Sequence, residues 1–135
     1  MKITVIIEKG KDSNFSAYSS SLKNHLIIGA GATAEEAKND FILAYGEMIQ
    51  SYVSKNEDIP KELQKLTFEY SYDISAFFNK YKWINVTQFS KTAKFSPSLM
   101  RQYKSGQYIS EKQISKIESA LHNAAKELLA VKLIV

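Results

Sequence analysis

The stretch LIIGAGATAEEAKNDF, residues 26–41, determines how the first half of the chain is built. Thr33 followed by Glu36 forms a capping box, in which the hydroxyl accepts from the third helical N–H and the glutamate reaches back. Apolar residues then recur at intervals of three and four, which predicts an amphipathic helix that runs to about Ser54. This core-facing stripe consists of Ala37, Phe41, Ala44, Met48 and Tyr52.

The glycines of this stretch also fit the loose G-x-G-x-x-A pattern of a dinucleotide-binding loop. Such a loop follows the first strand of a parallel βαβ unit and is followed by an acidic residue about 20 positions further on. Here the pattern follows a third predicted strand, and residues 49–51 still belong to the helix. We expect a turn and no phosphate site, with Gly29 and Gly31 serving either a positive φ or close packing of strand on helix.

Short strands flank the predicted helix. A continuous β-branched run opens the chain and predicts a strand buried on both faces or nearly so, and an alternating run after the helix predicts a half-buried strand. Between them, short polar turns separate two further strands. The expected strands are residues 2–8, 15–20, 25–28 and 66–70. Residues 1–71 therefore predict a β-β-β-α-β domain, with a boundary near Ser71–Asp73.

Composition and charge favour two modules in one globular chain. The 135 residues are 44% hydrophobic and include no cysteine, which excludes disulfides and thiolate metal sites. We find neither a signal peptide nor an apolar run of about 20 residues, and expect a cytoplasmic protein without a membrane segment. Residues 1–60 hold six lysines against eight acids, whereas residues 61–135 hold twelve basic residues against six acids. The basic second half indicates a polyanionic partner.

Residues 73–135 have helical character throughout. Asp73 is an N-cap for a first short helix, and a second helix starts at Asn85 or Val86. After a turn, Ser96 and Pro97 start a third helix, which ends at Lys104 before Gly106. Two helices of about two turns, joined by a short turn and closed by a glycine, predict a helix-turn-helix.

This predicted motif carries the candidate DNA-binding residues. Residues 73–106 hold six basic side chains against one acid. Arg101 and Gln102 have the side chains that read guanine and adenine edges, and Thr87 and Gln88 lie where a helix start binds phosphate. The full candidate set is Thr87, Gln88, Lys91, Lys94, Ser96, Pro97, Ser98, Arg101, Gln102 and Lys104. The alternative interpretation is a small helical bundle with solvated lysines.

The tail predicts an oligomer contact. Ser110 is the N-cap of a last helix. After it, apolar residues repeat at intervals of three and four, as in the heptad seam of a coiled coil. The end of this seam is too apolar for a monomer in water, so we expect a homodimer or higher oligomer, as suits a palindromic operator. The candidate dimerisation residues are Leu121, Leu128, Val131 and Val135.

No catalytic, metal or cofactor site is readable. His25 and His122 are single histidines without a partner visible in the sequence, and strand interiors offer almost no carboxylates for two-metal chemistry. We predict that the chain is not an enzyme. A residual metal-dependent ribonuclease is the third class, which cleavage of an RNA–DNA hybrid with Mn²⁺ or Mg²⁺ would reveal.

Both halves resemble known families. The strand meander, the G-x-G-x-T-x-E-E-A stretch and Ile59-Pro60 resemble the HicB antitoxin family over residues 1–71, which implies a cut-down ribonuclease-H-like sheet with one helix. Ser90, Phe95 and Gly106 resemble the lambda-repressor-like (XRE) helix-turn-helix family over about residues 73–125. The expected fold class is α+β: a HicB-like domain, residues 1–71, then an all-α helix-turn-helix domain, residues 73–135.

The combination implies an antitoxin that neutralises a HicA-like toxin and represses its own operon by binding double-stranded operator DNA. HicA toxins are small ribonucleases that cleave messenger RNA through a histidine. The mild acidity of the first half suits a basic partner, and the candidate toxin-binding residues are Glu35, Glu36, Asp40 and Glu47. The alternative is an orphan helix-turn-helix regulator whose N-terminal domain binds a ligand or another protein.

Overall fold

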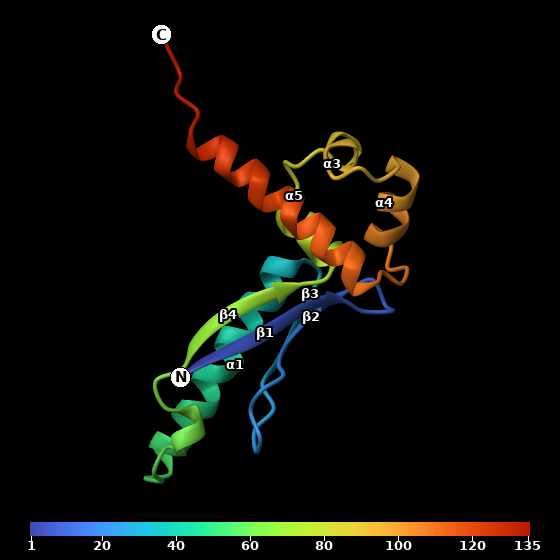
Figure 1. Ribbon diagram of the computed structural model, residues 1–135. Coiled ribbons are helices and arrows are strands. Elements are labelled where there is room, and N and C mark those ends of the chain that lie inside the picture. Colours follow the sequence, from blue (N-terminus) through green and yellow to red (C-terminus); the bar gives the residue numbers. More distant parts are fainter. The chain divides into compact units, whose positions relative to one another are not determined.

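The computed structural model describes residues 1–135 as two compact units, Met1–Lys82 and Trp83–Val135. Figure 1 shows the helices and strands of each unit. The division falls after residue 82, about ten residues beyond the predicted boundary at Ser71–Asp73.

The first unit contains a mixed four-stranded sheet. Strand β1 (Lys2–Lys9) pairs antiparallel with β2 (Phe15–Ser19), and β2 pairs antiparallel with β3 (Ile28–Gly31). On its other side β1 pairs parallel with β4 (Thr67–Tyr72), which gives the order β3-β2-β1-β4. The predicted β-β-β-α-β order of this unit is confirmed. The chain as a whole contains both helices and a sheet, as the α+β prediction requires.

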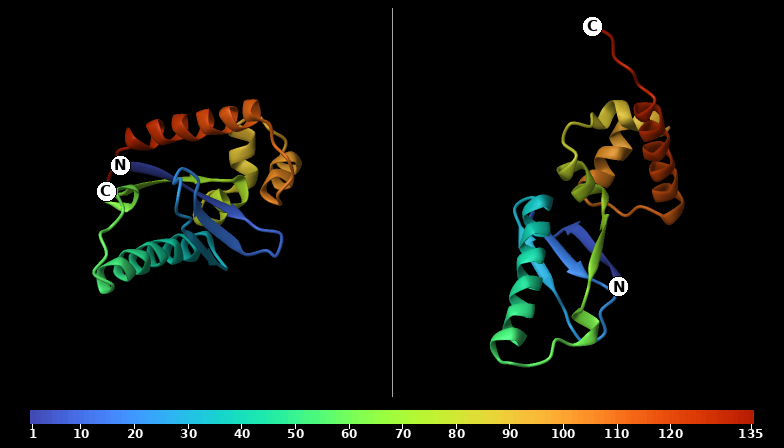
Figure 2. Two further views of the ribbon diagram at one scale, coloured as in Figure 1. Left: turned by 90° about the horizontal axis from the view of Figure 1, so that it is seen from below. Right: turned by 90° about the vertical axis from the view of Figure 1, so that its left-hand side faces the viewer.

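Helix α1 (Ala34–Ser54) packs on one face of this sheet, as both views of Figure 2 show. Its predicted stripe is confirmed: Ala37 and Phe41 are fully buried, and the other three members pack partly buried on the same core. Along β1 only alternate residues are buried, among them Val5 and Ile7, while Ile6 is half-buried. The first strand was predicted to be buried on both faces or nearly so; one face is buried under α1, and the residues of the other face are half-buried.

Gly29 and Gly31 lie within β3 and not in a turn after it. The third strand was predicted at residues 25–28 and instead begins at Ile28. A Cβ atom on Gly29 would lie 2.2 Å from the Phe41 nitrogen, and one on Gly31 would lie 2.5 Å from the Glu36 Cβ. Neither glycine has a positive φ. Close packing of strand on helix is therefore the backbone need that these glycines serve.

Helix α2 (Ile74–Lys80) belongs to the first unit because it is bonded to that unit's other elements. Asp73 caps α2 by accepting from Ala76 N–H at 2.7 Å, as predicted, and its second oxygen accepts from Lys9 N–H at 3.1 Å. Asn79 accepts from the N–H of Ala34 at the start of α1, 2.8 Å away. These nonlocal bonds explain why the division lies beyond the predicted boundary.

The second unit contains three helices, α3 (Val86–Thr92), α4 (Pro97–Lys104) and α5 (Glu111–Leu129). Their N-caps are Asn85, Ser96 and Ser110, so the predicted starts are confirmed. The predicted left-handed glycine is confirmed too, since Gly106 has a φ of 107°. The buried residues of this unit are Phe89, Ser90, Ala93, Phe95, Met100, Tyr103 and Ile117.

The tail departs from the predicted seam. Helix α5 ends at Leu129 with Ala130 as C-cap, so Val131 and Val135 lie beyond the helix and continue no heptad. Leu121 is half-buried, whereas Leu128 is 62% exposed. The segment after α5 extends away from α3 and α4 (Figure 1). A continuous helical seam to residue 135 is therefore wrong.

We predict that Gly29→Ala lowers the free energy of unfolding by about 2–3 kcal/mol, because the added Cβ would meet backbone atoms that cannot rotate away. Gly46→Ala is the matched control: a Cβ there meets nothing within 4 Å. Since Gly46 lies in the middle of α1, alanine should raise stability by about 1 kcal/mol. Urea unfolding followed by circular dichroism measures both changes, and equal effects would contradict the close packing at Gly29.

Candidate functional site

Helix α4 presents a polar and basic outer surface. Its N-terminus is fixed by Ser96, whose Oγ accepts from Leu99 N–H at 3.1 Å, with Pro97 in the first turn. Met100 and Tyr103 are buried on the inner face. The side chains that point outward are exposed, and this α4 surface consists of Ser98, Arg101, Gln102 and Lys104.

Arg101 links α4 to the start of α3. Its guanidinium Nη1 donates to the Thr87 Oγ1 at 3.4 Å, so two predicted site residues that are fourteen positions apart come together. Gln88 is exposed beside Thr87, but its backbone N–H is already bonded to the Asn85 side chain at 3.0 Å. Asn85 therefore occupies one of the N–H groups that were expected to hold phosphate.

A tight turn joins α3 to α4. Ser90 is fully buried, its carbonyl accepts from Phe95 N–H at 2.8 Å, and Phe95 itself is buried. Lys94 has a φ of 63°, a left-handed conformation that is uncommon for a residue with a side chain. The ammonium of Lys116, on α5, donates to the Lys94 carbonyl at 3.4 Å and lies 4.5 Å above the Phe95 ring. Lys91 and Lys94 are both exposed.

The positive charge of the chain is concentrated in the second unit. Residues 83–135 hold eight basic side chains against three acids, which leaves +5. Residues 1–82 hold ten basic side chains against eleven acids, which leaves −1. A polyanion is therefore attracted to the second unit much more strongly than to the first.

Three of the four acids predicted to bind a partner are already bonded within the first unit. Glu35 pairs with Lys80, whose hydrogen bond lowers the pKa of the Glu35 carboxyl. Glu36 accepts from Ala32 N–H and Asp40 accepts from Ala30 N–H, each at 2.9 Å. These carboxylates fix the start of α1 and the outer edge of β3. Glu47, the fourth, is exposed.

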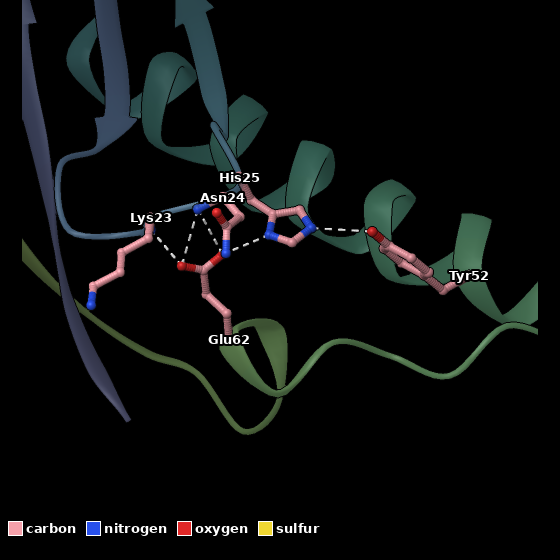
Figure 3. A network of polar contacts seen from close by, with 5 residues as sticks. All are labelled: Lys23, Asn24, His25, Tyr52 and Glu62. Carbon is pink, nitrogen blue, oxygen red and sulfur yellow. Dashed lines mark hydrogen bonds and ion pairs between the residues drawn. The ribbon is translucent and has the colours of Figure 1, made fainter.

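Figure 3 shows a polar network that the sequence did not predict, centred on His25. The His25 Nδ1 lies 2.6 Å from the Glu62 Oε2, and the His25 Nε2 lies 3.1 Å from the Tyr52 hydroxyl. The Glu62 carboxylate also accepts from the backbone N–H groups of Lys23 and Asn24. The network joins the loop before β3 to α1 and to the 3-10 helix η1 (Lys61–Leu63).

The geometry of the network indicates a structural clamp. Both ring nitrogens of His25 have partners, so in the neutral ring Nδ1 donates to Glu62 and Nε2 accepts from Tyr52. The hydrogen bond from His25 lowers the pKa of Glu62. The neighbouring hollow, of about 510 Å³, is lined by His25, Tyr52 and residues of α1. The sequence holds no local signal for this network, since His25 and Glu62 lie 37 positions apart.

Comparison with known proteins gives no match. No family model, no curated protein and no solved structure matches this chain. Within residues 1–135, no three His, Asp or Glu side chains are grouped so as to hold a metal ion. None of the helices combines the length and the apolar character that crossing a membrane requires.

We predict that Glu62 makes the first unit sensitive to acid. Because its folded pKa is lowered, it stabilises the fold above its ordinary value of 4.5, and this stability is lost as the pH falls through the lower folded pKa. Glu62→Gln should therefore be less stable than wild type at pH 7, with the difference shrinking below pH 4.5. Thermal unfolding between pH 3 and 7 measures this, with Glu57→Gln as an exposed-carboxylate control. A gap between wild type and Glu62→Gln that is the same at every pH would contradict the prediction.

Proposed function

We propose that this chain is an antitoxin of the HicA/HicB type, which binds and neutralises an mRNA-cleaving toxin and represses its own operon. In this proposal the first unit contacts the toxin and the second unit binds double-stranded operator DNA. The observation that carries the proposal is the α4 surface: Arg101 and Gln102 are exposed on a helix whose inner face is buried, beside Thr87 of α3.

The topology of the first unit supports the resemblance to HicB antitoxins. That resemblance implies a cut-down ribonuclease-H-like sheet with one helix. The first unit has a four-stranded sheet of order β3-β2-β1-β4, with the long helix α1 packed on one face. The stretch that carries the resemblance is where β3 packs on α1.

The packing of α3 on α4 supports a helix-turn-helix. A small residue, Ser90, is fully buried in α3, Phe95 is buried just before α4, and Gly106 closes α4 in the left-handed conformation. In such motifs the second helix enters the major groove and its exposed side chains contact base edges. Arginine and glutamine there pair with guanine and adenine, and a net charge of +5 supplies phosphate affinity.

The orphan-regulator alternative also has an observation in its favour. Glu35, Glu36 and Asp40 are bonded within the first unit, so they are less suited to a partner than free carboxylates are. The nearly balanced charge of that unit adds little steering toward a basic toxin. An N-terminal unit that binds something other than a toxin fits these facts equally well.

Co-expression separates the two candidates. If the chain is an antitoxin, its co-expression with a small basic protein encoded next to it should restore growth, and the two should co-purify. The Arg101→Ala variant is the matched control, because it alters the second unit and should still restore growth. Absence of both rescue and complex would favour the orphan regulator.

We predict that Arg101→Ala weakens operator binding by about 1–3 kcal/mol and relaxes preference at one base pair, since a bidentate base contact is lost. Lys91→Ala should weaken binding to all sequences alike, because it removes one phosphate contact. The slope of log K against log salt concentration should then become less steep by about one. Competition binding with the DNA upstream of the gene, at several salt concentrations, distinguishes the two effects. If both variants bind like wild type, α4 is not the recognition helix.

A further inference from the structure

Two backbone hydrogen bonds close the end of α3. Lys94 N–H donates to the Lys91 carbonyl at 3.2 Å, and Phe95 N–H donates to the Ser90 carbonyl at 2.8 Å. This helix ending requires a left-handed residue after the C-cap, and glycine is preferred there because it has no Cβ. Here the residue is Lys94, with a φ of 63°. The turn to α4 therefore contains backbone strain, which persists only where the surroundings compensate for it.

A lysine from outside the turn makes two contacts with it. The Lys116 ammonium, on α5, donates to the Lys94 carbonyl at 3.4 Å and lies 4.5 Å from the centre of the Phe95 ring. A cation over an aromatic face is attracted by the ring electrons, and a charged donor bonds a carbonyl more strongly than a neutral one does. The next residue, Ile117, is buried, which anchors α5 in the core of the second unit beside Lys116.

The Phe95 ring connects these contacts to α4. Phe95 is buried and meets the Tyr103 ring edge to face, with 6.0 Å between the ring centres. Tyr103 belongs to the buried inner face of α4, together with Met100. Because buried side chains pack closely, a shift of the Phe95 ring would displace this inner face. The outer face of the same helix, which carries Arg101, would move with it.

We propose that Lys116 is a positioning residue for DNA recognition. Its ammonium stabilises the strained turn at Lys94 and Phe95, and so sets the direction in which α4 presents its outer surface. This inference rests on the DNA binding proposed above for the second unit. Lys116 itself makes no phosphate contact in this proposal, because its ammonium is directed at the turn.

Amide hydrogen exchange tests the support of the turn without DNA. In the full chain, Lys116→Met removes the charge and keeps an unbranched side chain, so the Phe95 N–H should exchange about three- to tenfold faster than in wild type. Lys116→Arg keeps the charge and should restore slow exchange. Lys126→Met is the matched control, since it removes the same charge from α5 ten positions further along. Exchange in Lys116→Met as slow as in wild type would overturn the proposal.

Relief of the strain at residue 94 gives a second test by the same measurement. Glycine adopts a φ of 63° without strain, so Lys94→Gly should make the turn less dependent on Lys116. Lys116→Met should therefore accelerate Phe95 N–H exchange less in the Lys94→Gly chain than in wild type. Equal acceleration in both chains would overturn the claim that Lys116 compensates for this strain.

Competition binding connects the turn to recognition. The probe is the DNA upstream of the gene, and the competitor is a scrambled duplex of the same length. In variants that circular dichroism shows to be folded, Lys116→Met should lower the ratio of specific to non-specific affinity about three- to tenfold. The slope of log K against log salt concentration should stay unchanged, because no phosphate contact is lost. Lys126→Met should change neither quantity.

The outcomes separate this proposal from the proposed function. A slope that is less steep by about one, with an unchanged affinity ratio, would show that Lys116 binds phosphate and would overturn its positioning role. If the wild-type chain binds both duplexes equally, sequence-specific DNA binding fails, and the positioning role fails with it. The exchange of the Phe95 N–H would still report whether Lys116 supports the turn.

Discussion

The backbone of β3 lies directly on the backbone of α1, and the rest of the first unit depends on this contact. Only a residue without a Cβ allows it, because a Cβ on Gly29 would overlap the Phe41 nitrogen. The short distance fixes the rotation of α1, so that Ala37 and Phe41 enter the core. The same rotation brings Glu36 and Asp40 to the edge of β3 and turns Gly46 toward solvent.

Polar bonds then hold the ends of α1 to segments far away in the sequence. At its start, Ala34 donates to Asn79 and Glu35 pairs with Lys80, so α2 joins the first unit. Near its end, Tyr52 meets His25, whose ring is held by Glu62. The close contact with β3 sets the position of α1, and these bonds limit the movement of its two ends.

Local signals in the sequence predicted local structure well. Asp73, Ser96 and Ser110 cap the helices that they were expected to cap, because a cap needs only its own next few residues. The third strand was predicted too early because Gly29 and Gly31 are typical turn residues. In the structure both lie in β3, since the contact with α1 requires residues without a Cβ. Glu36 reaches back as the spacing predicted, but its carboxylate accepts from Ala32 N–H. The His25 network and the bonds of Glu35 and Asp40 depend on tertiary contacts, which no spacing in the chain encodes. DNA and toxin binding stay predictions.

The carboxylates at the edge of β3 have a consequence for how this protein can aggregate. Asp40 and Glu36 occupy the N–H groups of Ala30 and Ala32, which would otherwise be free to pair with a foreign strand. The sheet is thus partly sealed at β3, and its other border is β4. Growth of a continuous ribbon of sheets needs two open edges on every molecule. Because these two N–H groups are occupied, strand addition is disfavoured at β3, and association through β4 alone joins two molecules without extending into a fibril.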